Sequence, residues 1–194
     1  MVKHTKPIKG LTHGDITQTY HSGHEALDIV KFKQGLINGY GVPLCAVEDS
    51  RVDLVIGNGY TPDSTKNLER GYGVWLTGLE TGVPYVMWHT LPYIPISVGD
   101  IIRRGKIVAW VGNSGLVRAG GMDVPLDKRT ANPYPGTHLH LEYFSRGHTA
   151  GDWRGQNVNP LDYIDWSLEP TYTLGDYIAA MVNTVANMVK VVPT

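Results

Sequence analysis

Short runs of β-branched and aromatic residues, separated by glycine and proline, constrain the fold of this chain more than any other feature. Asn58-Gly59 and Thr81-Gly82, which stand between such runs, are typical of tight turns. Before about residue 165 the runs do not alternate with long helical segments. Closely spaced short strands predict a mainly β fold, built as an antiparallel sheet or sandwich. The expected strands cover residues 52–56, 72–77, 85–89, 107–112 and 136–142.

The last of these strands places two histidines two residues apart. Alternate residues of a strand face the same way, so His138 and His140 share one face and two leucines lie behind it. Their backbones are then about 6–7 Å apart, and both rings can serve one centre. The pattern therefore indicates either a metal or catalytic site, or two unrelated histidines on a partly exposed strand.

A second pair of polar residues occurs near the start of the chain. His24 and Asp28 are four residues apart, an offset that keeps both side chains on one side of a strand or a helix. Catalytic zinc usually takes three protein ligands from His, Asp or Glu and leaves a fourth position to water. The pair therefore suits a zinc site completed by a distant histidine. The alternative is a loop histidine followed by an aspartate that caps a turn.

The bulk properties fit one folded domain. A chain of 194 residues can bury a sizeable core, and 42% hydrophobic with 18% charged residues is ordinary for a globular protein. The formal net charge of −1 gives no indication of nucleic acid or an anionic membrane as a partner. No apolar run reaches the length of a membrane span. The single cysteine, Cys45, lies in an apolar run and is expected to be buried rather than nucleophilic.

The last segment follows a helical period. Thr173 to Asp176 resembles a capping box with Asp in place of Glu, and the apolar residues that follow recur at steps of three and four. They predict an amphipathic helix that ends before Pro193. We expect it to pack on the sheet or on another copy of itself, because its polar face has too few basic residues for membrane binding. The apolar residues are Leu174, Ile178, Met181, Val182, Val185, Met188 and Val189.

Two longer loops interrupt the strands. Residues 60–71 are polar, and residues 116–136 are rich in glycine and proline and lead into the strand with the two histidines. Long loops beside a site often shape substrate choice, and a tolerated insertion is the alternative interpretation.

These motifs together resemble the lysostaphin-type (LytM-like) zinc endopeptidases, which cut peptidoglycan peptides. The resemblance covers roughly residues 20–165 and depends on the order of the motifs as well as on each one. The chain departs from the family pattern at Ala26, where glycine is common, and at Thr137, where proline is frequent. Neither position supplies a metal ligand, so the departures affect local backbone shape. The matching segments are residues 24–28, 41–47, 88–91, 98–105, 111–115, 136–142 and 159–161.

The resemblance implies a fold, a domain division and one cofactor. The fold is an antiparallel, duplicated-hybrid-motif-like β structure with a substrate groove. The peptidase domain spans residues 20–165, between an N-terminal extension (1–19) and a C-terminal helical extension (166–194). One Zn²⁺ ion is bound by His24, Asp28 and His140, and aromatic walls of the groove are expected from Tyr20, Trp88, Tyr134 and Tyr143.

The resemblance also assigns His138 and His89 as catalytic histidines that do not bind the metal. His138, beside a ligand, is placed to take a proton from water and pass it to the leaving amine. His89 would donate to the oxyanion of the tetrahedral intermediate. Without the resemblance, His89 is better explained as a buried member of an aromatic cluster. His13, His21 and His148 are expected to have no role in the site.

The expected activity is hydrolysis of bacterial peptidoglycan at the cell wall, without stable membrane insertion. No export signal is evident at the N-terminus, and the expected routes are delivery by a phage virion, release from the host cytoplasm by a phage holin, or export by a dedicated system. A phage lysin is the favoured interpretation, and a mature form that has lost its leader is the alternative. Two alternatives belong to other classes of protein. One is a non-catalytic wall-binding or activator protein of the same fold. The other is a phosphocarrier domain of the sugar phosphotransferase kind, which would need no aspartate ligand.

Overall fold

An eight-stranded antiparallel sheet forms the centre of the molecule. The computed structural model describes residues 3–30, 39–57, 70–129, 134–152 and 155–191. The sheet strands are β1 (Ile16–Gln18), β2 (Leu27–Ile29), β4 (Ser50–Ile56), β5 (Gly73–Gly78), β6 (Pro84–Trp88), β7 (Ile101–Ile102), β11 (Leu139–Phe144) and β12 (Asn157–Val158). Their order is β1-β2-β11-β6-β5-β4-β7, and β12 also pairs with β11. Strand β11 is therefore central to the sheet, although it comes late in the chain.

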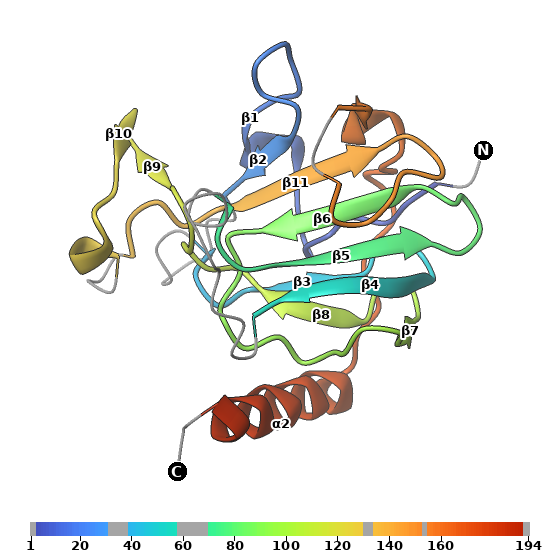
Figure 1. Ribbon diagram of the computed structural model, residues 1–194. Helices are drawn as coiled ribbons and strands as arrows, with labels where there is room; N and C mark the ends of the chain where they lie inside the picture. The colour runs from blue at the N-terminus through green and yellow to red at the C-terminus, as the bar shows by residue number, and fades with distance from the viewer. Residues whose placement is uncertain (1–2, 31–38, 58–69, 130–133, 153–154, 192–194) are drawn as a thin grey trace.

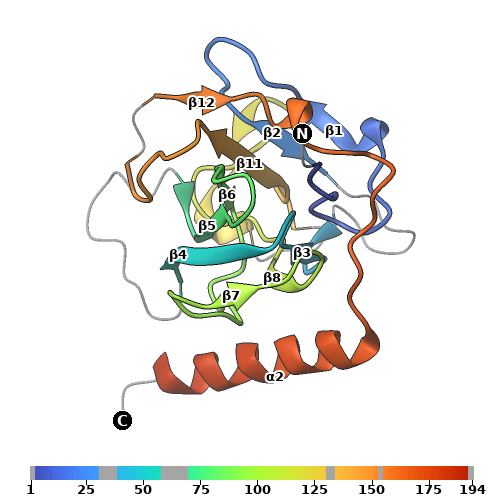
Figure 2. The ribbon, with the colours of Figure 1, turned by 90° about the vertical axis from the view of Figure 1, so that its right-hand side faces the viewer.

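A smaller sheet packs against one face of this sheet. It consists of β3 (Pro43–Cys45) and β8 (Ile107–Trp110), and Figure 2 shows it beside β4 and β7 and above the C-terminal helix. The core lies between the layers, where Leu44 and Val108 of the small sheet join Leu76, Met87 and other apolar residues of the main sheet. The expected antiparallel β-sandwich is confirmed, because the apolar faces of both sheets are covered.

The strands lie close to where the sequence predicts them, and the loops differ more. Residues 116–136 contain a small hairpin, β9 (Arg118–Ala119) with β10 (Met122–Asp123), and the 3₁₀ helix η3 (Leu126–Lys128). Figure 1 shows this hairpin standing out beyond the end of the main sheet. The expected turn at Asn58-Gly59 and most of the loop at 60–71 lie outside the described residues. The glycine-rich segment therefore contains short regular elements.

The N-terminal segment belongs to the same core as the sheets. Ile8 and Leu11 are buried in the main cluster, and a 3₁₀ helix, η1 (His13–Asp15), leads into β1. His4 forms a parallel bridge with Ile164, which follows the 3₁₀ helix η4 (Pro160–Asp162). Segments near the two ends of the sequence are therefore joined beside the sheet.

The C-terminal helix α2 (Leu174–Val191) begins as predicted, but its orientation differs from the expectation. Thr173 and Asp176 exchange side-chain to backbone hydrogen bonds of 2.7 and 3.1 Å, which is the expected capping box. The helix packs on β8 through a face that includes Ala180 and Thr184. The predicted apolar residues are instead exposed, and they are Leu174, Ile178, Met181, Val182, Val185 and Met188. None of the helices in the described part of the chain has the length and apolar character that a membrane span requires.

Cys45 has the environment expected from the sequence. Its side chain is fully buried beside Ile107 and Trp110. Burial raises the pKa of the Cys45 thiol to about 12, so the thiol stays protonated at neutral pH. This cysteine is a packing residue.

Candidate metal and catalytic site

Three neighbouring strands carry the site residues to one face of the main sheet. In the register of the sheet, His140 on β11 lies opposite Asp28 on β2 and opposite Trp88 on β6. His138 lies two residues before His140, just ahead of the first residue of β11, and therefore points to the same side. His24 stands in a tight turn just before β2, closed by a two-way backbone hydrogen-bond pair with His21. Residues separated by more than 110 positions thus meet because their strands are adjacent.

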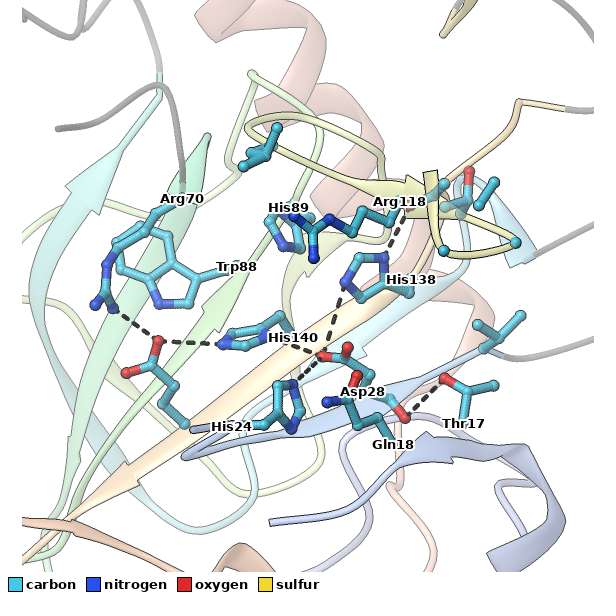
Figure 3. A pocket seen from close by; sticks show the side chains of 18 of the residues that line it. Thr17, Gln18, His24, Asp28, Arg70, Trp88, His89, Arg118, His138 and His140 are labelled. Atoms are coloured by element: carbon cyan, nitrogen blue, oxygen red, sulfur yellow. Dashed lines mark hydrogen bonds and ion pairs between the residues drawn. The ribbon is translucent and has the colours of Figure 1, made fainter. Parts of the chain in front are cut away.

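The carboxylate of Asp28 is the centre of this cluster. Its Oδ1 atom lies 2.7 Å from His140 Nδ1, 3.3 Å from His24 Nε2 and 3.7 Å from His138 Nε2 (Figure 3). Three imidazoles therefore converge on one carboxylate oxygen. This is the separation expected of groups that can share one cation.

His89 completes the cluster from the end of β6. Its ring centroid lies 4.5 Å from that of His138 and 5.6 Å from that of His140. All five site residues expected from the sequence therefore line a single pocket of about 1000 Å³. The β9–β10 hairpin and Arg70 also border this pocket, and Figure 3 shows Arg70 and Arg118 on different sides of the histidines.

Backbone carbonyl groups fix the tautomer of three of these histidines. A carbonyl oxygen only accepts hydrogen bonds, so each contacting Nδ1 must carry the proton. The Nε2 atom of each ring then presents a lone pair, and in His24 and His138 it faces Asp28. The contacts are His24 with Thr19 (3.2 Å), His89 with Ser114 (2.7 Å) and His138 with Gly136 (2.9 Å).

His140 has the opposite arrangement of ring nitrogens. Its Nδ1 faces Asp28, and its Nε2 lies 3.3 Å from Oε1 of Glu142. Burial alone would lower the pKa of His140, but the hydrogen bonds to Asp28 and Glu142 outweigh burial and raise it to about 9. Burial would likewise raise the pKa of Asp28, yet the histidines around it lower it to about 2. Asp28 is therefore an anion at neutral pH.

His89 and His138 are neutral bases. Burial, followed by the neighbouring His138 and His140, lowers the pKa of His89 well below its usual range. Burial also lowers the pKa of His138, although Asp28 acts in the opposite direction. A neutral imidazole accepts a proton, which is the state that a general base requires. At neutral pH both Nε2 atoms are therefore able to accept protons.

The donors suit a divalent cation best at His24, Asp28 and His140. Their ligand atoms lie within 4.8 Å of one another, as do those of a second group formed by His89, His138 and His140. Only the first group includes a carboxylate, which offsets the charge of the cation. In addition, His24 Nε2 is buried and has no hydrogen-bond partner among the described residues. Two imidazole nitrogens and one carboxylate oxygen form a common donor set for catalytic zinc.

The backbone at His89 is strained. Its φ of 60° lies in the left-handed region, which residues other than glycine rarely adopt. Gly112 passes so close that a Cβ atom there would lie 2.9 Å from the His89 carbonyl oxygen and 2.8 Å from the Thr90 carbonyl carbon. Strain of this kind costs about 1–3 kcal/mol and is concentrated at functional sites. It turns the imidazole of His89 toward the pocket at the point where β6 ends.

Comparison with solved structures identifies the fold. LytU matches with a TM-score of 0.50 at 18% identity, over 80% of this chain and 87% of that chain. Lysostaphin from Staphylococcus simulans, an antimicrobial peptidase, matches with a TM-score of 0.51 at 15% identity, over 84% of this chain and 53% of its own. A zinc-containing peptidase from Vibrio cholerae matches with a TM-score of 0.50 at 16% identity, over 85% of this chain and 41% of the Vibrio cholerae chain. The chain shares its fold with lysostaphin.

Comparison of the sequence alone finds no relative of this chain, in contrast to comparison of the structure. No family model and no curated protein sequence matches this chain. The chain also spans only about half of lysostaphin and less than half of the Vibrio cholerae peptidase. At 15–18% identity the likeness to lysostaphin and the other two proteins concerns the fold alone.

Three polar residues beside the histidine and aspartate cluster were not predicted. Glu142 contacts His140, Arg70 and Asn157. The side chains of Glu142, Arg70 and Asn157 line a small pocket next to His24. Glu142 could have been found, because it lies two residues after His140 and so faces the same side of the strand. Arg70 and Asn157 belong to other elements, and no local pattern marks them.

Of the four aromatic residues expected in the walls, Trp88 lines the pocket, whereas Tyr20, Tyr134 and Tyr143 are not among its lining residues. Tyr143 is fully buried on the other face of the sheet, where its hydroxyl contacts His4, so the prediction for this residue was wrong. An odd offset from His140 puts a strand residue on the opposite face. Tyr134 stacks on Tyr40.

Proposed function

We propose that this protein is a zinc-dependent endopeptidase that hydrolyses peptide bonds in bacterial peptidoglycan. The observation that carries the proposal is the convergence of His24, Asp28 and His140 around one point, with neutral His138 and His89 beside it. The shared fold with a solved zinc-containing peptidase and with lysostaphin supports the same conclusion. The donor set keeps a net positive charge when it holds Zn²⁺.

In this proposal His24 Nε2, Asp28 Oδ1 and His140 Nδ1 hold the metal. Bound zinc supplies Lewis acidity, which activates water and polarises the scissile carbonyl group. The tautomers in the structure suit this role, because both histidine ligands present a lone pair once His140 has lost its Nδ1 proton. The chain's own contribution is to hold these donors on rigid strands.

His138 acts as the general base and then as the general acid. Its Nδ1 proton is held by the Gly136 carbonyl, so Nε2 is free to take a proton from the attacking water. The same nitrogen can return that proton to the amine that leaves when the peptide bond breaks. Proton transfer of this kind contributes typically 10²–10⁴-fold to the rate.

His89 has a narrower role than the sequence suggests. Because its Nδ1 donates to Ser114, its neutral Nε2 accepts a hydrogen bond and does not donate one. Donation to an oxyanion would require protonation, which burial and two neighbouring histidines oppose. We therefore assign His89 as a second acceptor that orients the attacking water.

Mass spectrometry of purified peptidoglycan after incubation with the protein tests the proposal. Cleaved peptides are expected, and a chelator should abolish the cleavage. The His140→Ala variant should lose both bound zinc and cleavage, whereas His138→Ala should keep zinc and lose cleavage by at least about 100-fold. Normal cleavage by His140→Ala would show that the metal assignment is wrong.

The place of action follows from the proposed substrate. A peptidoglycan hydrolase must reach the cell wall, and a phage provides delivery by the virion or release from the host cytoplasm. Lysis of intact cells from outside, compared with lysis after permeabilisation, distinguishes these two routes.

A further inference from the structure

Glu142 is the carboxylate nearest to the proposed metal site that does not belong to it. Its side chain is only 8% exposed, and it lies on β11 two residues beyond His140. Three polar groups contact it: His140 Nε2 at 3.3 Å from Oε1, Arg70 Nη1 at 2.7 Å from Oε1, and Asn157 Nδ2 at 3.1 Å from Oε2. Both oxygens are therefore used, and each contacting group is able to donate a hydrogen bond.

Both ring nitrogens of His140 face a carboxylate, Asp28 at Nδ1 and Glu142 at Nε2. An ionised carboxylate only accepts hydrogen bonds, so Glu142 keeps a proton on Nε2 when a cation replaces the proton on Nδ1. Nδ1 then has a lone pair available for a cation, on the side where Asp28 lies. In His24 a backbone carbonyl has the equivalent function. Of the two proposed histidine ligands, His140 is the one whose outer contact is a side chain.

We propose that Glu142 is a positioning residue that orients His140 for metal binding, and that Arg70 and Asn157 hold Glu142 in place. The proposal rests on the zinc site described above. The three residues come from separate parts of the fold, since Arg70 precedes β5, Glu142 lies on β11 and Asn157 begins β12.

Arg70 makes a buried carboxylate tolerable at this position. A buried charge without a partner is costly, and removing one member of a buried ion pair leaves the other uncompensated. The Arg70 guanidinium also lies over the ring of Trp88, 5.8 Å from its centroid, and Trp88 faces His140 in the sheet register. The arginine thus packs against the strand that borders the ligand. Loss of Arg70 is expected to loosen Glu142 and, through it, His140.

Zinc affinity tests the proposal without depending on catalysis. The apo protein is titrated with Zn²⁺ in competition with a chromophoric chelator, for the wild type and for Glu142→Ala. We expect the alanine variant to bind zinc about 10–100-fold more weakly, as is usual when an outer contact of a metal ligand is lost. Glu142→Gln keeps an oxygen acceptor and should recover most of the affinity. Glu25→Ala is the matched control, because Glu25 lines the same small pocket but is exposed.

A second readout reports the tautomer directly. Nitrogen NMR of the ¹⁵N-labelled apo protein should show His140 protonated at Nε2 in the wild type and in Glu142→Gln. In Glu142→Ala the population of the Nδ1-only tautomer should rise at high pH. A merely structural role for Glu142 would not move this signal. Arg70→Gln should lower zinc affinity several-fold. Because the Arg70 side chain is 34% exposed, this variant replaces Glu142→Ala in the test if Glu142→Ala does not fold.

The outcomes separate this inference from the proposed function. If the wild type binds zinc and folded Glu142→Ala and Arg70→Gln bind it within twofold, the positioning role is wrong and the zinc site stands. The same holds if the His140 tautomer is unchanged in both variants. If the wild type binds no zinc, the proposed function itself fails.

Discussion

At the scale of single residues, the site depends on which nitrogen of each histidine carries the proton. Three rings are held by backbone carbonyls, and His140 is held by carboxylates on both sides. The hydrogen bonds to the two carboxylates outweigh burial and raise the pKa of His140, whereas burial lowers the pKa of His89 and of His138 and leaves both rings neutral. The residue types alone do not distinguish the four rings, because their environments set the charge.

Metal binding is expected to release a proton from His140. Because the pKa of His140 is raised to about 9 without metal, its Nδ1 is protonated at pH 7, where a zinc ion must bind. The apparent zinc affinity should therefore rise about tenfold per pH unit between about pH 7 and 9 and then level off. Calorimetry at pH 7.5 in buffers of different ionisation enthalpy should show release of about one proton. A binding heat that does not depend on the buffer would contradict this expectation.

The sequence predicted the members of the cluster but not their supports. His138 and His140 follow from strand alternation, and His24 with Asp28 follow from their spacing and from the family resemblance. Arg70 contacts Glu142 across 72 residues of chain, and only the order of strands in the sheet brings them together. The wrong prediction for Tyr143 shows that alternation must be applied to every residue of a strand, the aromatic ones included.

At the scale of elements, helix α2 shows what a periodic pattern does and does not determine. The three- and four-residue steps predicted the helix and its cap, yet Thr184 and Asn187 face the body of the protein. The body presents polar groups there: the Trp110 indole N–H donates to Thr184, and the Ile94 carbonyl accepts from Asn187. These buried groups need polar partners, so the polar side of the helix is the one that packs.

The self-association expected from the sequence stays a prediction, and the exposed stripe of α2 is the place to test it. Five of its residues are spaced by steps of four, three, four and three, which is the heptad spacing of a helix–helix seam, and they are Leu174, Ile178, Met181, Val185 and Met188. A second copy offers the same uncharged stripe. Val185 is 52% exposed, so Val185→Glu should leave the fold intact and abolish the dimer.

Sedimentation velocity over a range of concentrations measures this association. Ala186→Glu adds the same charge to an exposed position beside the stripe and should leave the dimer unchanged. A wild-type chain that stays monomeric at about 100 μM, or a dimer that survives Val185→Glu, would count against pairing through α2.

At the scale of the whole molecule, the two faces of the main sheet have different tasks. His140 and Glu142 point into the pocket, whereas Tyr143 points into the core between the sheets. On the core side, His4 of the N-terminal segment contacts Tyr143 and Glu48. The segment before β1, expected as an extension, is thereby anchored under the strand that carries the site.

The His4→Ala substitution should weaken the fold and leave the metal site intact. It removes a hydrogen bond of 2.9 Å to the Tyr143 hydroxyl and an ion-pair contact of 3.1 Å to Glu48, at side chains that are 0% and 3% exposed. Loss of one partner from a buried contact of this kind costs about 3 kcal/mol. Thermal unfolding of the apo protein should therefore occur at a clearly lower temperature, with zinc affinity unchanged. His13→Ala, at an exposed ring that packs at a tilt against Trp166, is the control and should cost well under 1 kcal/mol.

The same substitution should also change the response of the fold to acid. Burial would raise the pKa of Glu48, but hydrogen bonds to His4 and Thr81 outweigh burial and lower it. A carboxyl group whose pKa is lowered by folding stabilises the protein above its unfolded value of about 4.5, and this contribution is lost as the pH falls through the folded value. The wild type should therefore lose more stability than His4→Ala when the pH is lowered from 6 to 3, as measured by urea unfolding. Parallel losses in the two proteins would mean that His4 does not hold the Glu48 carboxylate in its charged form.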